Sequence, residues 1–332
     1  MPANLTPQYL EAEQRFRQAR TPAEKIACLE DMLRLIPKHK GTEKMQADLR
    51  RRLSKLRHEQ HKSAAARRNA GPQVEKEGVG QVAIIGPPNV GKSALLRALT
   101  KATPEVADYP FTTRKPLPGM VRFENVQIQL VDLPPLSREY MEPWVSQLVR
   151  NADALLLVVD LSQAEVLEQV ELACEILTTW KIVPVAQPLS PDTLQEFPPG
   201  LKALRLLLLG NKIDAPQSQD HWEILQELYG KRWPMMAVSV MRGDNLDRLP
   251  GQLYTLLDLV RVYTKAPGKK PDLHAPFTLP RGSTVVDVAA AVHKDFAARL
   301  RFARVWGPGK YEGQMVQRHY VVEEGDVIEL HI

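Results

Sequence analysis

The chain has 332 residues, enough for two or three domains, and its hydrophobic content of 44% and charged content of 25% are typical of a globular protein. Its only cysteines, Cys28 and Cys174, lie far apart in the sequence, which excludes a disulfide framework and a cysteine-based zinc site. The first residues have no signal-peptide pattern, and no apolar run is long enough to cross a bilayer. We therefore expect a cytoplasmic protein without a membrane partner, and the net charge of +5 permits an RNA partner.

Residues 1–58 are predicted to form a helical hairpin. The sequence Thr21-Pro22-Ala23-Glu24 resembles a capping box with proline at the first helical position, and residues 36–41 interrupt the helical pattern. The second helix and the residues after it are basic, which is typical either of a solvated helix face or of a contact with RNA phosphates. No aromatic residues alternate with the basic ones, so base stacking is not indicated. The basic residues are Arg50, Arg51, Arg52, Lys55, Arg57, Lys62, Arg67 and Arg68.

A strand–helix alternation begins after residues 59–80, which lack apolar periodicity and are predicted to be a linker. From residue 81 to residue 265, short apolar runs alternate with helical patterns, as in a doubly wound, mostly parallel sheet of the α/β class. The proline-rich stretch 182–202 is predicted to be an irregular insertion. A helix is expected from about Leu246 to Val262, with Pro250 in its first turn.

The stretch Gly86-Pro87-Pro88-Asn89-Val90-Gly91-Lys92-Ser93 has the G-x-x-x-x-G-K-S spacing of a phosphate-binding loop. A β-branched apolar run precedes it and a helical pattern follows it, which is the setting that this motif requires. The glycines allow backbone N–H groups to approach phosphate oxygens, and the helix directs its positive end toward the same anion. Lys92 is expected to reach the β- and γ-phosphates, and Ser93 to supply a hydroxyl to Mg²⁺. The predicted phosphate-binding residues are Pro88, Asn89, Val90, Gly91, Lys92, Ser93 and Ala94.

Asp132 ends the hydrophobic strand that follows the loop and its helix, which is the Walker B position. We expect its carboxylate to hold Mg²⁺, because the ion bridges the β- and γ-oxygens of a highly charged triphosphate. The alternative is a strand-end carboxylate that bonds only to nearby backbone.

A base-recognition motif, Asn211-Lys212-Ile213-Asp214, follows a later buried strand. The Asp214 carboxylate can accept hydrogen bonds from the N1–H and N2–H₂ groups of guanine, and adenine offers no such pair of donors. Lys212 is expected to lie along the base, and Asn211 to brace the phosphate loop. Ser239 is expected near the guanine O6, with a backbone N–H of the same turn as donor, and Val240 is also predicted to bind the guanine. For Ser239, a strand-end serine that bonds its own backbone is the alternative.

Several motifs together resemble the Obg-like GTPases, above all the developmentally regulated GTP-binding (DRG-like) proteins. The tail, with Leu-Pro-Arg-Gly-Ser-Thr-Val at 279–285 and Val-Trp-Gly at 305–307, resembles a TGS domain, which implies a β-grasp fold for the small α+β unit at residues 266–332. By this resemblance Thr113 is the switch residue that senses the γ-phosphate and Mg²⁺, and Thr112 is the alternative. The other resembling stretches are 86–93, Asp-Tyr-Pro-Phe-Thr-Thr at 108–113, Gln-Leu-Val-Asp-Leu-Pro at 129–134, and 211–214.

The sequence also departs from that family. Pro135 stands where the family has the glycine whose N–H meets the γ-phosphate, and proline has no N–H. Leu136 stands where fast GTPases place a glutamine that orients the attacking water, so we expect slow intrinsic hydrolysis. Related GTPases with asparagine at the position of Asn89 bind K⁺ there, which makes K⁺ a candidate cofactor beside Mg²⁺. The larger inserted domain of DRG-like proteins is not expected, because the insertion at 182–202 is too short.

Two functions remain open on the sequence alone. One is a monomeric molecular switch that binds GTP and GDP, hydrolyses GTP slowly and contacts the ribosome, rRNA or tRNA through the basic hairpin and the TGS domain. The other is a guanine-nucleotide-binding interaction module with little or no hydrolysis, which Pro135 and Leu136 favour. Thr113, Lys92 and Asp132 favour retained chemistry.

Overall fold

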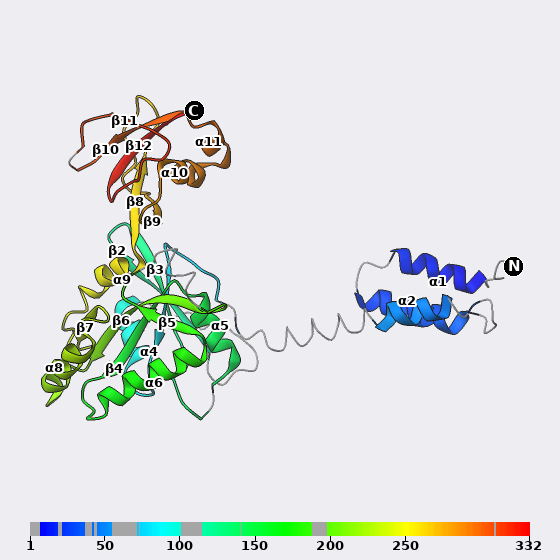
Figure 1. Ribbon diagram of the computed structural model, residues 1–332, viewed down its shortest axis with the longest axis horizontal. Helices are drawn as coiled ribbons and strands as arrows, with labels where there is room; N and C mark the ends of the chain where they lie inside the picture. Colours follow the sequence, from blue (N-terminus) through cyan, green and yellow to red (C-terminus); the bar gives the residue numbers. More distant parts are fainter. Residues whose placement is uncertain are drawn as a thin grey trace. The chain divides into compact units, whose positions relative to one another are not determined.

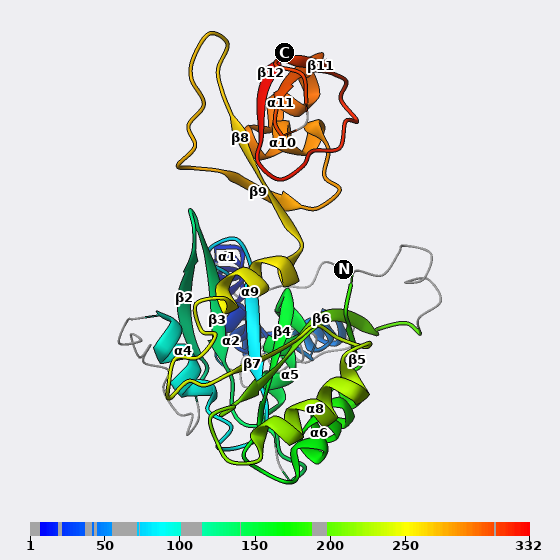
Figure 2. The ribbon, with the colours of Figure 1, turned by 90° about the vertical axis from the view of Figure 1, so that its left-hand side faces the viewer.

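The computed structural model describes residues 7–18, 22–36, 42, 45–54, 72, 74–100, 115–139, 141–187, 198–308 and 310–332. The chain divides into two units, Met1–Gly71 and Pro72–Ile332 (Figures 1 and 2). No helix within the described ranges is long and apolar enough to cross a membrane.

The first unit is helical, as predicted, but it contains an additional helix. Helix α1 (Pro7–Gln18) precedes α2 (Pro22–Leu35), and residues 45–54 form a further helical segment. Tyr9 and Ala12 of α1 are buried in one cluster with Leu29 and Leu49, so α1 is an integral part of this small core. The described basic residues of the predicted hairpin, Arg50, Arg51 and Arg52, are exposed, whereas Lys55, Arg57, Lys62, Arg67 and Arg68 lie outside the described residues.

The second unit begins with a doubly wound, mostly parallel sheet, as the alternating pattern predicts. Its strand order is β2-β3-β1-β4-β6-β5, with β7 also paired to β6, and only the β2–β3 pair is antiparallel. The strands are β1 (Gln81–Ile85), β2 (Leu117–Phe123), β3 (Val126–Asp132), β4 (Ala154–Asp160), β5 (Ile182–Val185), β6 (Lys202–Asn211) and β7 (Met235–Val238). The helices are α4 (Lys92–Thr100), α5 (Pro143–Asn151), α6 (Val166–Thr179), α8 (Ser218–Tyr229) and α9 (Leu249–Leu257).

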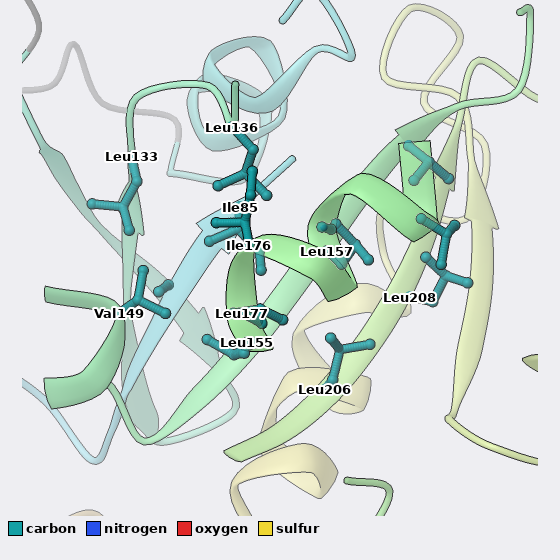
Figure 3. Packing of buried hydrophobic residues seen from close by; sticks show 14 of the residues in the cluster. Ile85, Leu133, Leu136, Val149, Leu155, Leu157, Ile176, Leu177, Leu206 and Leu208 are labelled. Atoms are coloured by element: carbon teal, nitrogen blue, oxygen red, sulfur yellow. The ribbon is translucent and has the colours of Figure 1, made fainter. Parts of the chain in front are cut away.

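Successive residues of the buried strands face opposite sides of this sheet. Ile85, Leu155 and Leu157 join the core that contains residues of α5, α6 and α8. Figure 3 shows part of this core, including Leu136 from the segment after β3. Ile84 and Leu156 face the other way and join residues of α4 and α9. The sheet is therefore covered on both faces, which explains why its central strands are continuously apolar.

Two predicted connections take part in the sheet instead. Residues 182–185 of the expected irregular insertion form β5, which pairs with the first half of the ten-residue strand β6, while β7 pairs with its second half. At the end of the predicted linker, the Val79 N–H donates to the Gln127 carbonyl and the Gln129 N–H to the Gly80 carbonyl. Both segments are short and carry proline or glycine, so their sequence gives only a weak strand signal.

The carboxyl-terminal part forms a β-grasp sheet, with strand order β11-β10-β12-β8-β9 and one parallel pair, β8 with β12. Thr284 caps α10 in a capping box with Asp287, and this helix packs Val285 and Val288 into the core of the unit. The elements are β8 (Leu259–Thr264), β9 (Phe277–Pro280), α10 (Val285–Val292), α11 (Lys294–Arg299), β10 (Phe302–Trp306), β11 (Gln314–Val316) and β12 (Asp326–His331).

The β-grasp sheet starts earlier in the chain than predicted. Asp258 alone separates the end of α9 from β8, so the expected helix to Val262 stops at Leu257. Residues 259–264, which the sequence analysis assigned to the first domain, belong to the second sheet. Val260 and Val262 are buried in the β-grasp core, and their alternation is the strand signal that the helical interpretation overlooked.

Arg261 of β8 connects the two sheets of this unit. Its guanidinium contacts the Glu124 carboxylate and donates to Asn125 Oδ1 at 2.9 Å, both in the turn between β2 and β3. Its Nε also donates to Glu324 Oε1 at 2.6 Å, and Asn125 Nδ2 donates to the Tyr263 hydroxyl at 2.8 Å.

Candidate functional site

The loop between β1 and α4 has the backbone geometry that its two glycines allow. Gly86 has φ 150° and Gly91 has φ 96°, values that residues with a Cβ rarely adopt. A Cβ on Gly86 would lie 2.2 Å from the Val158 carbonyl oxygen, and one on Gly91 would lie 2.4 Å from Asn211 Nδ2. These glycines therefore let the loop pass close to β4 and β6 while it leads into the amino end of α4.

Lys92, the first residue of α4, is only 7% exposed. Its ammonium donates to the carbonyl oxygens of Gly86 at 2.9 Å and Pro87 at 2.8 Å. Burial lowers its pKa to about 8, and the nearby Asp132 carboxylate opposes this shift. A positive charge is thus held beneath the loop, where phosphate oxygens would be its natural partners.

Ser93 and Asp132 meet at the end of β3. The Ser93 hydroxyl donates to Asp132 Oδ2, while Oδ1 of the same carboxylate is buried and has no partner among the described residues. Burial raises the pKa of Asp132, and the bond from Ser93 and the charge of Lys92 lower it again. A hydroxyl beside an incompletely bonded carboxylate fits Mg²⁺, which binds through one or two carboxylates plus phosphates. No cluster of three or more His, Cys, Asp or Glu side chains suited to a metal occurs in the described ranges.

A cavity of 570 Å³ opens at this place, a volume suited to a small ligand. It is lined by Pro88, Asn89, Gly91, Lys92, Ser93, Ala94, Lys115, Asp132, Leu133, Pro134 and Pro135. A cavity of 620 Å³ lies at the opposite end of β6, beside Arg205 and Trp233. The smaller cavity is the site of interest, because ligands of such sheets bind beyond the carboxyl ends of the strands.

Residues 133–136, which we call the trigger segment, have no free backbone N–H. The N–H of Leu133 donates to the Ile84 carbonyl at 3.4 Å, and that of Leu136 donates to the Gly86 carbonyl at 3.0 Å. Pro134 and Pro135 have none to offer. The Leu136 side chain is fully buried in the core of Figure 3, so this position faces away from solvent.

Asn211, at the end of β6, is hydrogen-bonded to the phosphate loop. Its Nδ2 donates to the Val90 carbonyl at 2.8 Å, and its Oδ1 accepts the N–H groups of Lys212 at 2.8 Å and Val240 at 3.2 Å. One buried side chain thus ties together the phosphate loop, the end of β6 and the turn after β7.

Lys212 is held by a residue that the sequence analysis did not select. Its ammonium lies 2.5 Å from Asp160 Oδ2, at the end of β4. Asp160 is 4% exposed, and its Oδ1 accepts the Ser162 N–H at 2.9 Å and hydroxyl at 2.6 Å. The available signal was the acidic end of a buried strand, but only the β4–β6 pairing, with Asp160 opposite Asn211, reveals its partner.

Asp214 offers an acceptor that is still available. Its Oδ1 is shielded from solvent and has no hydrogen-bond partner in the described part of the chain. The bond from Ser239 holds the pKa of Asp214 below its usual value, so the group is a carboxylate at neutral pH. Such an acceptor is suited to a ligand with two adjacent N–H donors, as guanine has.

The turn at residues 239–243, which we call the base turn, contains Ser239 and Val240, which are predicted to bind the guanine. The Ser239 side chain is buried and accepts the Arg242 N–H at 3.0 Å. The Val240 N–H donates to Asn211 Oδ1 at 3.2 Å. The Met241 N–H has no partner in the described ranges and is the donor left for a ligand; its side chain is 90% exposed. The predicted switch residues Thr112 and Thr113 lie outside the described residues.

Known proteins resemble this chain over both sheets. The family model for 50S ribosome-binding GTPases matches residues 81–186, and that for TGS domains matches residues 260–332. The uncharacterized GTP-binding protein MJ1326 of Methanocaldococcus jannaschii is 32% identical, covering 93% of this chain and 92% of the relative. Human developmentally-regulated GTP-binding protein 2 is 28% identical, covering 92% and 98%.

The chain belongs to the developmentally regulated GTP-binding (DRG) protein family. The alignment with MJ1326 extends over 363 positions, more than the 332 residues of this chain, so MJ1326 contains segments that this chain lacks. The fold of this DRG protein also resembles the Schizosaccharomyces pombe YchF GTPase, with a TM-score of 0.51 and 15% identity over 78% of this chain and all of that one. It is thus a GTP-binding protein of a GTPase family.

Proposed function

We propose that this protein is a GTP-dependent switch whose intrinsic hydrolysis of GTP is slow. The observation that carries the proposal is the trigger segment beside otherwise complete phosphate chemistry. Lys92, Ser93 and Asp132 lie together at the cavity, while residues 133–136 present no free N–H toward it. Retained phosphate and metal groups support nucleotide chemistry, and the missing donor supports a low rate.

Each of these residues has a separate role in the proposed phosphoryl transfer. Lys92 exchanges its carbonyl partners for β- and γ-phosphate oxygens, and α4 directs its positive amino end toward the same charge. Ser93 and Asp132 would hold Mg²⁺, which neutralises charge on the β- and γ-oxygens when bound. A water oxygen attacks the γ-phosphorus, the bond to the β–γ bridging oxygen breaks, and the proton of the water passes to the released phosphate. In the described ranges no side chain of the trigger segment can orient that water.

Base selection belongs to the other end of the site. We propose that Asp214 accepts from N1–H and N2–H₂ of guanine, that Lys212 lies along the ring, and that the Met241 N–H meets O6. Asn211 fixes the position of the base-recognition motif relative to the phosphate loop through its hydrogen bond to the Val90 carbonyl.

K⁺ is a candidate second cation. Asn89 is exposed and lines the cavity, with φ 63°. Its amide oxygen is a suitable ligand for a monovalent ion. Hydrolysis would then be faster in KCl than in NaCl.

A ribosome or structured RNA is the partner that we propose. The description of the matched GTPase family model refers to 50S ribosome binding, and Arg50 and Arg51 are exposed on one helical segment of the amino-terminal unit. Arg52 pairs with Asp48 at 2.8 Å, so the first two arginines are the better candidates for phosphate contacts. Arg50→Gln with Arg51→Gln should weaken co-sedimentation with ribosomes at low salt, and unchanged sedimentation would contradict the proposed role of this helix.

The second candidate function is a binding module that does not hydrolyse GTP, and the trigger segment favours it. Single-turnover GTP hydrolysis distinguishes the two, measured in KCl and in NaCl, with and without ribosomes, alongside GTP and GDP affinities. Measurable turnover that Lys92→Ala abolishes supports the switch. Tight binding without turnover under every condition would make the protein a binding module.

A further inference from the structure

Lys115 is a cation at the phosphate cavity for which the motifs provide no role. It lines the same 570 Å³ cavity as the phosphate loop, Asp132 and Pro135. It lies just before β2, outside the phosphate loop, the base-recognition motif and the trigger segment.

The strand register shows why Lys115 lies beside the trigger segment. Strands β2 and β3 are antiparallel, and Leu117 pairs with Asp132. Lys115 comes two residues before Leu117, at the end of β2 that lies against Asp132, and it lines the same cavity as Pro134 and Pro135. The residue is therefore close to the position at which the family's N–H donor is missing.

The register also shows which face of the sheet borders the cavity that Lys115 lines. Residues two apart on a strand share a face, as do residues directly opposite on antiparallel strands. Leu117 and Asp132 therefore point to one side of the sheet, and Lys115 lines the cavity beside Asp132. That side is the one covered by α4, because Leu117 packs against the cluster that contains Leu95 and Leu96 of α4. Ser93 lies at the start of the same helix and bonds to Asp132.

The charge of Lys115 is available to a ligand. Among the described residues it has no hydrogen bond and no ion pair, whereas Lys92 is engaged by two carbonyl oxygens and Lys212 by Asp160. A half-buried lysine without a partner in the described part of the chain, at a cavity lined by the phosphate loop, is placed to bind an anion.

We propose that Lys115 contacts the γ-phosphate of bound GTP. Its positive charge takes the place of the backbone N–H that Pro135 lacks. This inference rests on the proposed function of the site. The ammonium donates to a γ-phosphate oxygen in the bound state and stabilises the charge on that oxygen as the bond to the bridging oxygen breaks. It transfers no proton. GDP has no γ-phosphate, so Lys115 distinguishes the triphosphate from the diphosphate.

Equilibrium binding tests the proposal without requiring turnover. Affinities are measured for GDP and for the non-hydrolysable β,γ-imido analogue of GTP, in the full chain with Mg²⁺. Lys115→Gln should weaken analogue binding about tenfold, as expected for a charged hydrogen bond, and change GDP binding less than twofold. Lys115→Arg should largely restore the preference. Lys231→Gln, an exposed lysine beyond the amino end of β7, is the matched control and should change neither affinity.

Single-turnover hydrolysis measures whether Lys115 also accelerates the cleavage of GTP. Loss of one fixed donor to a developing charge lowers rates about 10²–10³-fold in other enzymes, and we expect about 10- to 100-fold for Lys115→Gln at saturating GTP. An equal loss of GDP and analogue affinity, or no change in either, overturns the proposal. If the wild-type protein hydrolyses no GTP, the proposed switch fails, but the ratio of the two affinities still decides the role of Lys115.

Discussion

The two ends of the nucleotide site differ in how completely their groups are arranged. At the base end, Asn211 makes three hydrogen bonds, Lys212 is paired with Asp160, and a free acceptor remains on Asp214. At the phosphate end, the loop, Ser93 and Asp132 are in place, but the trigger segment has no N–H to offer. Nucleotide recognition and nucleotide turnover can therefore diverge within one site, because separate segments provide them.

The largest effect should come from the base end. Asp214→Asn replaces an acceptor with an amide that cannot accept from both guanine donors, so GTP and GDP affinities should fall about 10³-fold. The amide N–H₂ suits the C2 carbonyl of xanthine, so XTP should bind better to this variant than to the wild type. Competition against fluorescently labelled GDP would measure both changes. Undiminished GTP binding would show that Asp214 does not select the base.

The second effect concerns stability. Leu136 is fully buried, so Leu136→Gln should destabilise the protein by about 2–4 kcal/mol, because a polar side chain replaces an apolar one in the core. It should not accelerate hydrolysis, since the side chain at this position faces the core. Urea unfolding and single-turnover assays would measure the two results. The exposed control Leu228→Gln should shift stability by less than about 0.5 kcal/mol. Faster hydrolysis in Leu136→Gln would mean that the trigger segment rearranges.

Restoring the missing donor should have a moderate effect. Pro135→Gly returns an N–H to the position where the family senses the γ-phosphate, and hydrolysis should rise about tenfold, as one charged hydrogen bond allows. The greater freedom of the unfolded chain should reduce stability by about 1 kcal/mol. Pro134→Gly, one residue earlier, is the matched control and should not accelerate hydrolysis. Equal rates in both variants and the wild type would place the rate limit elsewhere.

The smallest effect should arise from Asp160. Asp160→Asn removes the charge that holds Lys212, and GTP and GDP affinities should fall together by about fivefold. The rate constant for hydrolysis at saturating GTP should not change, because the variant acts on the base end only. Glu175→Gln, which removes an exposed partner of Arg138, serves as the control. A selective loss of GTP over GDP would break the separation between the two ends.

The sequence predicted the parts of the fold and site that depend on local spacing. Lys92, Ser93, Asp132 and Asn211 were found because each belongs to a motif next to a strand, and the structure brings them to one edge of the sheet. The alternating strands and helices likewise predicted the doubly wound sheet. The roles of the individual site residues stay predictions that the variants above test.

The missed residues depend on strand order and register. Asp160 becomes a partner of Lys212 only because β4 lies beside β6, and Lys115 reaches the cavity only because β2 pairs with β3. No spacing along one chain encodes these neighbours. The Met241 N–H is the available donor because the Val240 N–H already donates to Asn211 Oδ1. A sequence motif does not show which of several N–H groups is already hydrogen-bonded. Helix α9 was extended too far because Val260 continues the helical spacing of Leu256 and Leu257.

The joint at Asp258 has a consequence for protease resistance. This residue has φ 51°, its side chain bonds to Arg281 at 2.9 Å, and it is the whole connection between α9 and β8. Proteases cleave segments that can be drawn out as several extended residues, and a one-residue connection flanked by hydrogen-bonded elements provides none. Limited digestion should therefore leave residues 249–264 uncut, and the GTPase and TGS parts should not be released from each other by cleavage at this joint.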